Sequence, residues 1–225
     1  MCFSVKIERD LKKLAQIFGA FPDRGAFVTL SQETKRNPKI FKVPGPDNRI
    51  YPNIFSPVLV SQGGRRNIRP MRYRIRPAGS LEEVPAKYNL YNARMEGLLK
   101  RKTWRALVGK NHCLFPFKQF YEWVNGPDGK KKLVTFFPKG KDIMWAPGLY
   151  DKWISEDKSF IVESFALITN DPPSEVLAQG HDRAPLFLKE EAIDEWLDFP
   201  SSEKKVSPIE ILSKRGSIFY EHTYE

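Results

Sequence analysis

Cys2 is the residue with the most distinctive chemistry in this chain, because it directly follows Met1. If Met1 is removed, which a small second residue permits, the mature chain begins with an α-amine and a thiol two carbons apart. Such groups have ordinary pKa values of about 7.7–8.0 and about 8.5, so both are partly reactive at neutral pH. The amine can form a Schiff base with an aldehyde, and the thiolate can then close a thiazolidine ring intramolecularly. The alternative is an accidental cysteine in a frayed terminus.

Three further polar residues lie in contexts that suit proton transfer or positioning. Glu122, in FYEW, lies either on a solvent face or in an aromatic pocket, where a carboxyl group suits general acid–base work. Asn92, in YNARMEG, precedes a predicted helix and could instead cap it. His181, in GHDRAP, follows another predicted helix, although a lone histidine is more often structural than catalytic.

A basic stretch, RRNIRPMRYRIRP, contains six arginines around Tyr73. If residues 71–76 form a strand, Arg72, Arg74 and Arg76 share one face at intervals of roughly 6.7 Å. Such a ladder suits an extended phosphate backbone, and an aromatic ring beside it could stack on a base. The alternative is a solvated charged face.

The apolar pattern predicts the elements that must position these residues. Helices are expected over 8–19, about 94–107, 173–179 and 188–197, and strands over 54–61, 71–76, 113–124, 132–137, 143–153 and 159–169. The strand over 159–169 is apolar on both faces and should be central and buried. A long loop is expected over 33–52 and a turn over 125–129. We therefore expect a single α+β domain over 1–225, with a core to about residue 200 and a tail over 201–225.

Composition limits the classes of protein. The chain has 225 residues, of which 41% are hydrophobic and 28% charged, as in soluble globular proteins. It lacks an apolar run long enough to span a membrane, a secretory signal and the spacings of metal-binding motifs, so we expect a cytoplasmic protein with no metal and no cofactor. Its two cysteines should be reduced. The net charge of +10 favours an anionic partner, with nucleic acid first.

Four segments in this order resemble the SOS response-associated peptidase (SRAP) family. They are Cys2 after Met1, Asn92 and Arg94 in NARMEG, Glu122 in FYEW, and His181 and Arg183 in HDRAP. PNIFSP, CLFP, APGLYDKW and FALITND also look similar, so the resemblance runs from residue 1 to about 197. It implies an α+β fold with a mainly antiparallel, barrel-like curved sheet flanked by short helices.

The resemblance also implies a function in the DNA damage response. Family members bind single-stranded DNA and trap abasic sites, whose opened sugar exposes an aldehyde, as a thiazolidine crosslink to the N-terminal cysteine. The same chemistry is proposed to begin after removal of the initiator methionine, which gives the family its peptidase name. This protein would then be a monomeric enzyme of hydrolase and lyase type, of the bacterial cytoplasm and associated with the nucleoid when bound to DNA.

By resemblance, four residues carry the chemistry. Cys2 would be the nucleophile and the crosslinking residue, and Asn92 would position its backbone and amine. Glu122 would shuttle protons during sugar opening and imine formation. His181 would act as acid and base on the sugar and in crosslink reversal. Two other functions stay open: a non-catalytic module that binds single-stranded or modified DNA, and a cysteine peptidase in which Cys2 and His181 form a nucleophile–base pair.

The expected DNA contacts include departures from the family. Arg94 and Arg183 would hold the phosphates that flank the lesion, and Trp123 and Tyr73 would stack on or shape the DNA. The family usually continues Met-Cys with Gly-Arg, where this chain has Phe-Ser, and it has Trp-Gly-Leu-Ile-Pro where this chain has YRIRP. We therefore expect the chemistry to be retained and the preferred DNA structure to differ. Cys113 is expected to be a buried core thiol rather than a second nucleophile.

Overall fold

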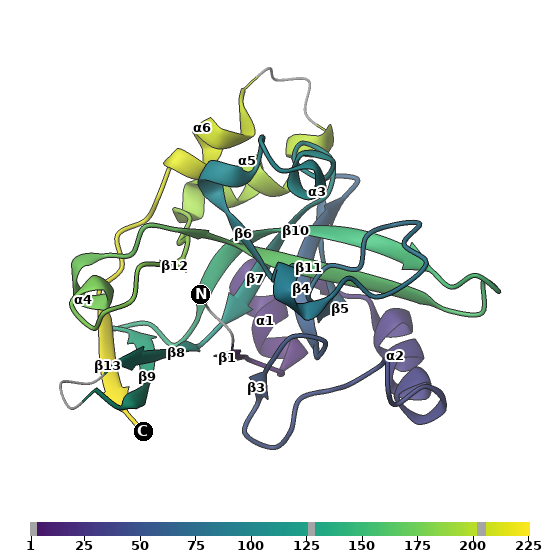
Figure 1. Ribbon diagram of the computed structural model, residues 1–225. Coiled ribbons are helices and arrows are strands. Elements are labelled where there is room, and N and C mark those ends of the chain that lie inside the picture. The colour runs from purple at the N-terminus through teal and green to yellow at the C-terminus, as the bar shows by residue number, and fades with distance from the viewer. Residues whose placement is uncertain (1–3, 126–128, 202–205) are drawn as a thin grey trace.

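Two β-sheets carry the fold, with short helices around them (Figure 1). The computed structural model describes residues 4–125, 129–201 and 206–225. The helices are α1 (Leu11–Phe18), α2 (Arg24–Arg36), α3 (Lys102–Arg105), α4 (Ser174–Leu177), α5 (Ile193–Leu197) and α6 (Pro208–Ser213). The strands are β1 (Ser4–Lys6), β2 (Phe21–Pro22), β3 (Arg49–Ile50), β4 (Phe55–Gln62), β5 (Arg65–Tyr73), β6 (Asn92–Arg94), β7 (His112–Phe117), β8 (Gln119–Asn125), β9 (Lys131–Pro138), β10 (Met144–Ile154), β11 (Ile161–Asn170), β12 (Ala184–Pro185) and β13 (Tyr220–Tyr224).

Five strands of the larger sheet close into a barrel. Successive neighbours β5, β4, β7, β10 and β11 pair antiparallel, and β11 then returns to β5 in a parallel pairing, with Phe165 opposite Tyr73. Further along β11, the short strand β6 pairs on one edge and β12 on the other. The predicted fold class, a mainly antiparallel and barrel-like sheet with short helices, is therefore confirmed.

The barrel strands bury both of their faces. On β7, Phe115 and Phe117 belong to the core shared with the second sheet, whereas Leu114 belongs to the core covered by α1, α3, α5 and α6. On β11, Phe165 and Ala166 divide between the same two cores. Strands buried on both faces have near-continuous apolar sequences, as the pattern over 159–169 predicted.

The second sheet has the order β13–β9–β8–β1–β3 and is antiparallel throughout. Strand β1 pairs with β8 so that Ser4 lies opposite Tyr121. The C-terminal segment contributes α6 and also β13, which pairs with β9. This sheet therefore brings the first described residues against the strand that contains Glu122.

Several predicted elements are confirmed with small shifts at their ends. Helix α1 begins after Asp10, whose side chain accepts hydrogen bonds from the N–H groups of Lys12 and Lys13, and it ends at Gly19 in the left-handed region. Strands β4, β9, β10 and β11 and helices α4 and α5 also lie within or close to their predicted ranges. Residues 126–128 of the predicted turn lie outside the described residues.

Other predicted elements were wrong for identifiable reasons. The helix predicted over 94–107 is replaced by β6, a 3-10 turn at Met95–Gly97 and the single turn of α3, because Asn92–Arg94 pairs with β11. The strand predicted over 113–124 is two strands, since the chain passes from the barrel to the second sheet at Lys118. The loop predicted over 33–52 begins later, because α2 continues to Arg36.

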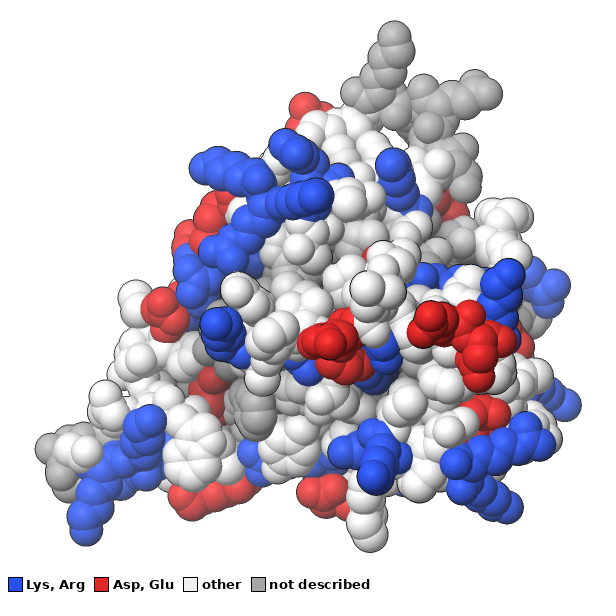
Figure 2. All heavy atoms as spheres, turned by 45° about the vertical axis from the view of Figure 1, so that its right-hand side comes forward, with Lys and Arg blue, Asp and Glu red and all other residues white. Residues whose placement is uncertain are grey.

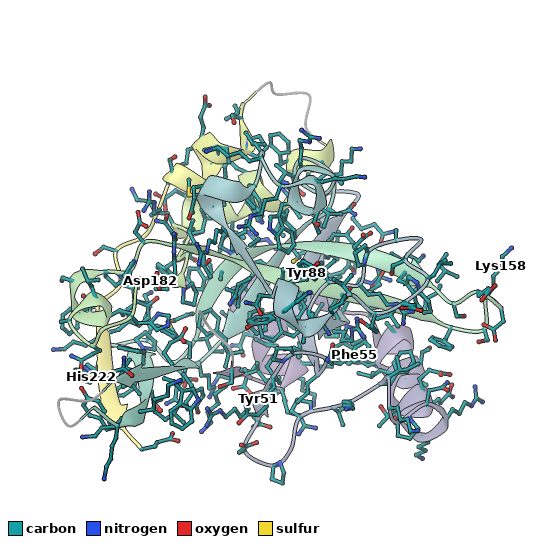
Figure 3. The ribbon with its side chains drawn as sticks, in the orientation of Figure 1. Tyr51, Phe55, Tyr88, Lys158, Asp182 and His222 are labelled. Atoms are coloured by element: carbon teal, nitrogen blue, oxygen red, sulfur yellow. The ribbon has the colours of Figure 1, made fainter. Side chains whose placement is uncertain are left out.

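The β10–β11 hairpin extends well beyond the barrel. Lys158 lies at its tip, on the opposite side of the molecule from Asp182, which follows α4 (Figure 3). The segment that contains His181 therefore lies at the other end of β11 from the hairpin tip. Within the described ranges, no helix is long and apolar enough to cross a membrane.

Candidate active site

Glu122 and His181 form a buried pair. The imidazole Nε2 of His181 lies 2.9 Å from the carboxylate Oε2 of Glu122, and the two residues are 8% and 4% exposed. Alternation along β8 explains the burial, because Glu122 points to the same side as Phe120, which stacks on Phe136 in the core. Trp123 points the other way and is 57% exposed. Of the two placements open for Glu122, the solvent face is therefore wrong.

The contacts of His181 determine where its protons lie. Its Nδ1 is 2.8 Å from the carbonyl oxygen of Arg183, which can only accept a hydrogen bond, so Nδ1 carries a proton. The backbone N–H of Arg183 approaches the same nitrogen at a longer distance of 3.4 Å. With Nδ1 protonated, the 2.9 Å contact between Nε2 and Glu122 requires one shared proton. The pair is either imidazolium with carboxylate or imidazole with carboxylic acid, and it can both give and take a proton.

Asn92 is held by the barrel rather than by a helix. Its side-chain Oδ1 accepts a hydrogen bond of 3.2 Å from the hydroxyl of Tyr73, and its backbone lies opposite Leu167 of β11. No helix starts at Asn92, so the capping alternative is wrong. Because its oxygen is oriented by Tyr73, the amide of Asn92 has a fixed direction in the site.

Arg94 and Arg183 lie on either side of β11, with Arg94 in β6 and Arg183 directly before β12. Arg94 lies opposite Thr169 of β11, and Thr169 in turn lies opposite Pro185 of β12. The Arg183 guanidinium donates to both carboxylate oxygens of Glu96, at 2.6 and 3.2 Å. This ion pair joins the NARMEG and HDRAP segments, a link that neither motif reveals by itself. Phosphate binding by the two arginines stays a prediction.

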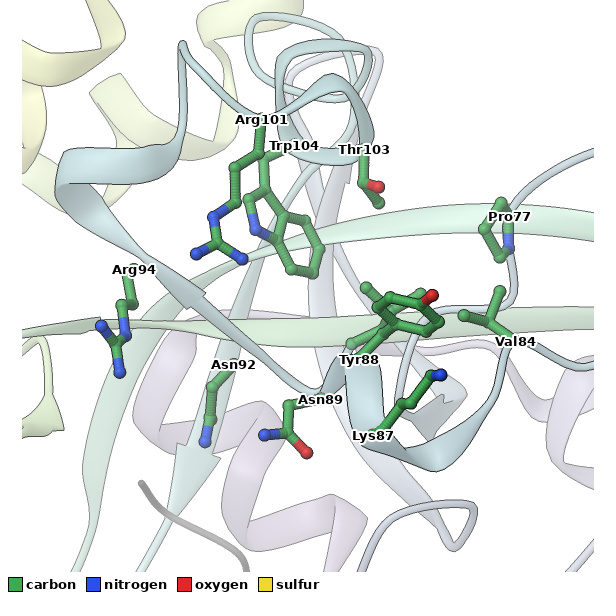
Figure 4. A pocket seen from close by; sticks show the side chains of 11 residues that line it. Pro77, Val84, Lys87, Tyr88, Asn89, Asn92, Arg94, Arg101, Thr103 and Trp104 are labelled. Atoms are coloured by element: carbon green, nitrogen blue, oxygen red, sulfur yellow. The ribbon is translucent and has the colours of Figure 1, made fainter.

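A pocket of about 510 Å³ opens beside Asn92 (Figure 4). Arg94 and Arg101 project from one side, and Lys87 and Tyr88 from the other. No acidic residue is among its described lining residues, so the pocket carries a net positive charge. Figure 2 shows lysines and arginines gathered at the upper left of one face and acidic side chains across its middle. Arg101 lies in a second basic run, KRKTWR, which is the sequence signal that points to it, whereas nothing in the sequence singles out Tyr88.

The predicted arginine ladder is wrong. Strand β5 ends at Tyr73, and Arg74 adopts a φ of 106°, so residues 71–76 do not form one strand. The three arginines are 3%, 7% and 8% exposed and surround Glu83 instead of facing solvent. A phosphate backbone cannot lie along side chains that the protein itself covers.

The stacking role predicted for Tyr73 is also wrong. Its ring is fully buried and packs against Tyr91, Phe115 and Phe165, so no base can reach it. The side chain acts instead through its hydroxyl, which orients Asn92. Trp123 is exposed next to Glu122, and its contact with DNA stays a prediction.

Cys2 and Phe3 lie outside the described residues. Cys113 is fully buried within the core of the barrel, and burial raises the pKa of its thiol far above the ordinary value. The prediction of a buried core thiol at Cys113 is thereby confirmed. Among the residues that the structure describes, no three His, Cys, Asp or Glu side chains are grouped so that they could hold a metal ion.

The family model described as SOS response associated peptidase (SRAP) matches residues 1–218. This chain belongs to the SRAP family. Among its SRAP relatives, the abasic site processing protein YobE of Bacillus subtilis (strain 168) is 26% identical over 153 residues, which cover 68% of each chain. The abasic site processing protein HMCES of Pongo abelii is 26% identical over 191 residues, covering 68% of this chain and 54% of that protein.

Solved structures share this SRAP fold. A protein from Bacteroides thetaiotaomicron superposes with a TM-score of 0.74 at 19% identity and covers 99% of this chain and 91% of its own. A phage-related protein from Bordetella bronchiseptica superposes with a TM-score of 0.64 at 18% identity, covering 99% and 94%. At these identities the likeness concerns the fold.

Proposed function

We propose that this SRAP protein processes abasic sites in single-stranded DNA and captures them covalently through Cys2. The observation that carries the proposal is the buried contact between Glu122 and His181, in which Nε2 lies 2.9 Å from Oε2. The relatives named abasic site processing proteins support the same substrate. The opened sugar of an abasic site exposes an aldehyde, and proton transfer is what its capture by an amine requires.

The pairing of β1 supports Cys2 as the nucleophile. Ser4 lies opposite Tyr121, and because the pairing is antiparallel, the N-terminal end of β1 is at the Glu122 end of this register. One residue separates Cys2 from Ser4, and the two Cα–Cα steps between them span at most about 7 Å. This short connection supports the proposal that an N-terminal amine and thiol would reach the Glu122–His181 pair.

The first chemical step is opening of the sugar ring. The proton of the C1′ hydroxyl leaves, a proton is delivered to the ring oxygen O4′, and the C1′–O4′ bond breaks to give the aldehyde. One proton is taken from one oxygen while another is given to a second oxygen. The Glu122–His181 pair suits this step, because one of its two side chains can donate a proton to the sugar while the other accepts one from it.

The second step joins the protein to the sugar. The α-amine of the processed N-terminus attacks C1′, the C1′ oxygen leaves as water after protonation, and an imine forms. The Cys2 thiolate then attacks the same carbon while the imine nitrogen gains a proton, which closes the thiazolidine. Amine, thiol and aldehyde give one ring and one water, so no oxidant or cofactor enters the balance. Asn92, oriented by Tyr73, would hold the amine for attack.

DNA binding would use the positive pocket and its surroundings. Arg94 and Arg101 on one side and Lys87 on the other suit the phosphates next to the lesion, and the absence of acids among the described lining residues favours an anion. Arg183 would contribute a phosphate contact in competition with Glu96, to which it is paired. The exposed ring of Trp123 would contact a base near the site.

The decisive experiment mixes purified protein with a single-stranded oligonucleotide that holds one abasic site, followed by a denaturing gel and intact mass. A heat-stable adduct whose mass equals the Met1-free protein plus the oligonucleotide minus one water is expected. Cys113→Ser should form the adduct, and Cys2→Ala should not. DNA binding without an adduct by Met1-free protein would support the non-catalytic binding module, and cleavage of an unrelated protein that is lost in Cys2→Ala would support the peptidase.

A further inference from the structure

Arg72, Arg74 and Arg76 converge on one short segment of the chain. Arg72 donates to both carboxylate oxygens of Glu83, at 2.5 and 3.2 Å, and Arg76 approaches the same carboxylate at 3.4 Å. Arg74 donates to the backbone carbonyl of the next residue, Val84. Two-oxygen pairing of a guanidinium with a carboxylate is the most directional form of ion pair in proteins. One side chain from the end of β5 and two from the residues that follow it therefore hold residues 83 and 84.

The charges of the arginines and of Glu83 in this cluster depend on one another. Burial lowers the pKa of Arg74 and Arg76, although both guanidinium groups stay charged at neutral pH. Burial would raise the pKa of Glu83, but the hydrogen bonds and charges of the arginines hold it below its ordinary range. Glu83 is the acid that compensates these buried cations, so its removal would leave them without their partner.

Further contacts fix the residues that precede Glu83, so that the whole segment 78–84 is held in place. Arg76 stacks over the ring of Trp153 at 3.3 Å, and the indole N–H of Trp153 donates to the carbonyl of Ser80 at 2.7 Å. The backbone N–H of Ala78 donates to Asp151 at 2.9 Å. Residues 78–84 are thus fixed to strands β5 and β10 by side chains rather than by sheet pairing.

The same segment continues directly into the wall of the positive pocket. Val84, Lys87, Tyr88 and Asn89 line the pocket on the side opposite Arg101 (Figure 4). Arg74, whose guanidinium donates to Val84, has a φ of 106°, a left-handed conformation that is strained for a non-glycine residue. Glycine would adopt this conformation without strain, but it could not donate a hydrogen bond to Val84. The side chain of Arg74 therefore has a structural role at this position.

We propose that Arg72, Arg74, Arg76 and Glu83 are positioning residues that fix the wall formed by residues 84–89 and thereby set the shape of the DNA-binding pocket. The arginines act on DNA through this wall and not by touching phosphates. The part of the proposal that concerns DNA rests on the proposed function, whereas the fixing of the wall does not depend on it.

Removal of Glu83 should have opposite effects on DNA affinity depending on whether Glu83 acts only through its charge or also fixes the wall. Glu83→Ala makes the protein more positive, so simple electrostatics predicts tighter binding of single-stranded DNA. If Glu83 fixes the wall, the same change weakens binding, by about tenfold for loss of a charged hydrogen-bonded pair. Glu82→Ala is the matched control, because it removes the same charge from an equally exposed neighbour, whereas the ion pairs with Arg72 and Arg76 are made by Glu83. The control should leave affinity unchanged or slightly tighter.

Salt dependence separates positioning from direct contact. Arg72→Met should lower the affinity for undamaged single-stranded DNA without changing the slope of log K against log salt. If Arg72 instead neutralised a phosphate directly, its removal would reduce the magnitude of that slope by about 0.7. Reduced slopes in Arg72→Met and Arg76→Met would overturn the proposal.

Hydrogen exchange tests the wall without using DNA. In Glu83→Ala, the amides of residues 78–89 should exchange at least tenfold faster than in the unaltered protein, while those of β4 and β9 stay protected. Glu83→Gln, which keeps the shape and removes the charge, should give an intermediate increase. Unchanged protection over 78–89 in both variants would refute the proposal, even if the protein proved not to bind DNA at all. Normal crosslinking with unchanged protection would refute the inference and leave the proposed function intact.

Discussion

Protonation of His112 should set the acid limit of stability. The residue is 2% exposed, and its ring stacks on Trp196 with centroids 3.7 Å apart. Its Nδ1 lies 2.8 Å from the carbonyl of Trp196, and its Nε2 accepts the N–H of Gly109 at 2.8 Å. Only the neutral ring can donate at one nitrogen and accept at the other, so a second proton would break the contact with Gly109.

The direction and size of the effect follow from this environment. Burial is the main cause that lowers the pKa of His112 from 6.5 to about 4. Between pH 6.5 and about 4, His112 binds a proton in the unfolded chain but not in the folded protein. The contribution of the neutral ring to the free energy of unfolding is therefore complete above pH 6.5 and is lost as the pH falls toward 4. At about 1.36 kcal/mol for each pH unit, the whole difference corresponds to about 3 kcal/mol.

Urea unfolding measures this loss. The free energy of unfolding should be compared at several pH values between 7 and 4 for the unaltered protein and for His112→Gln, which has no proton to bind. The variant will be less stable at pH 7, and its stability should then fall less steeply, by about 1.4 kcal/mol for each pH unit near pH 5.

Equal pH dependence in the unaltered protein and His112→Gln would refute the reasoning, because the buried neutral ring would then contribute nothing to acid sensitivity. A confirmed difference has a practical use. Rates of the proposed crosslinking reaction should therefore be measured above pH 6.5, where protonation of His112 does not destabilise the fold.

Three other outcomes are expected. Glu122→Gln should slow formation of the abasic-site adduct by about 10²–10⁴-fold in single-turnover gel assays, since the proposed general acid–base group is lost, while affinity for undamaged DNA changes little. An equal loss of affinity would mean that Glu122 acts in binding. Gly148→Ala should destabilise the fold by about 1–3 kcal/mol in urea, because its new Cβ would lie 2.7 Å from the carbonyl oxygen of Ala166 and 2.9 Å from the Cys113 sulfur. The Cys113 thiol, whose pKa is raised by burial, should resist iodoacetamide until the protein unfolds, and rapid labelling in the native state would contradict its burial.

Local patterns predicted the elements whose structure is local. Helix α1 has a capping aspartate, an apolar face and a glycine stop within a dozen residues, and β11 has an apolar run that only a buried strand explains. The helix predicted over 94–107 failed because β6 is stabilised by pairing with β11, more than seventy positions away in sequence. Pairing partners at that distance leave no trace in a local pattern.

In the candidate site, too, the sequence identified individual residues but not the contacts between distant segments. Motifs identified Glu122, His181 and Asn92 as candidates, but their partners came only from the folded chain. The hydroxyl of Tyr73 on Asn92 and the carboxylate of Glu96 on Arg183 join different segments. The arginine ladder failed at Arg74, since regular alternation presumes an extended backbone that its positive φ interrupts.

The pairing of Ser4 with Tyr121 has a consequence during synthesis. The first strand of the second sheet has its partner more than a hundred residues later, so it has nothing to pair with until β8 leaves the ribosome. At about 5–20 residues per second, that interval lasts several seconds. Throughout it the N-terminus is an unfolded, accessible end, open to the enzymes that trim nascent chains. The proposed removal of Met1 would therefore have time to take place before β1 pairs with β8.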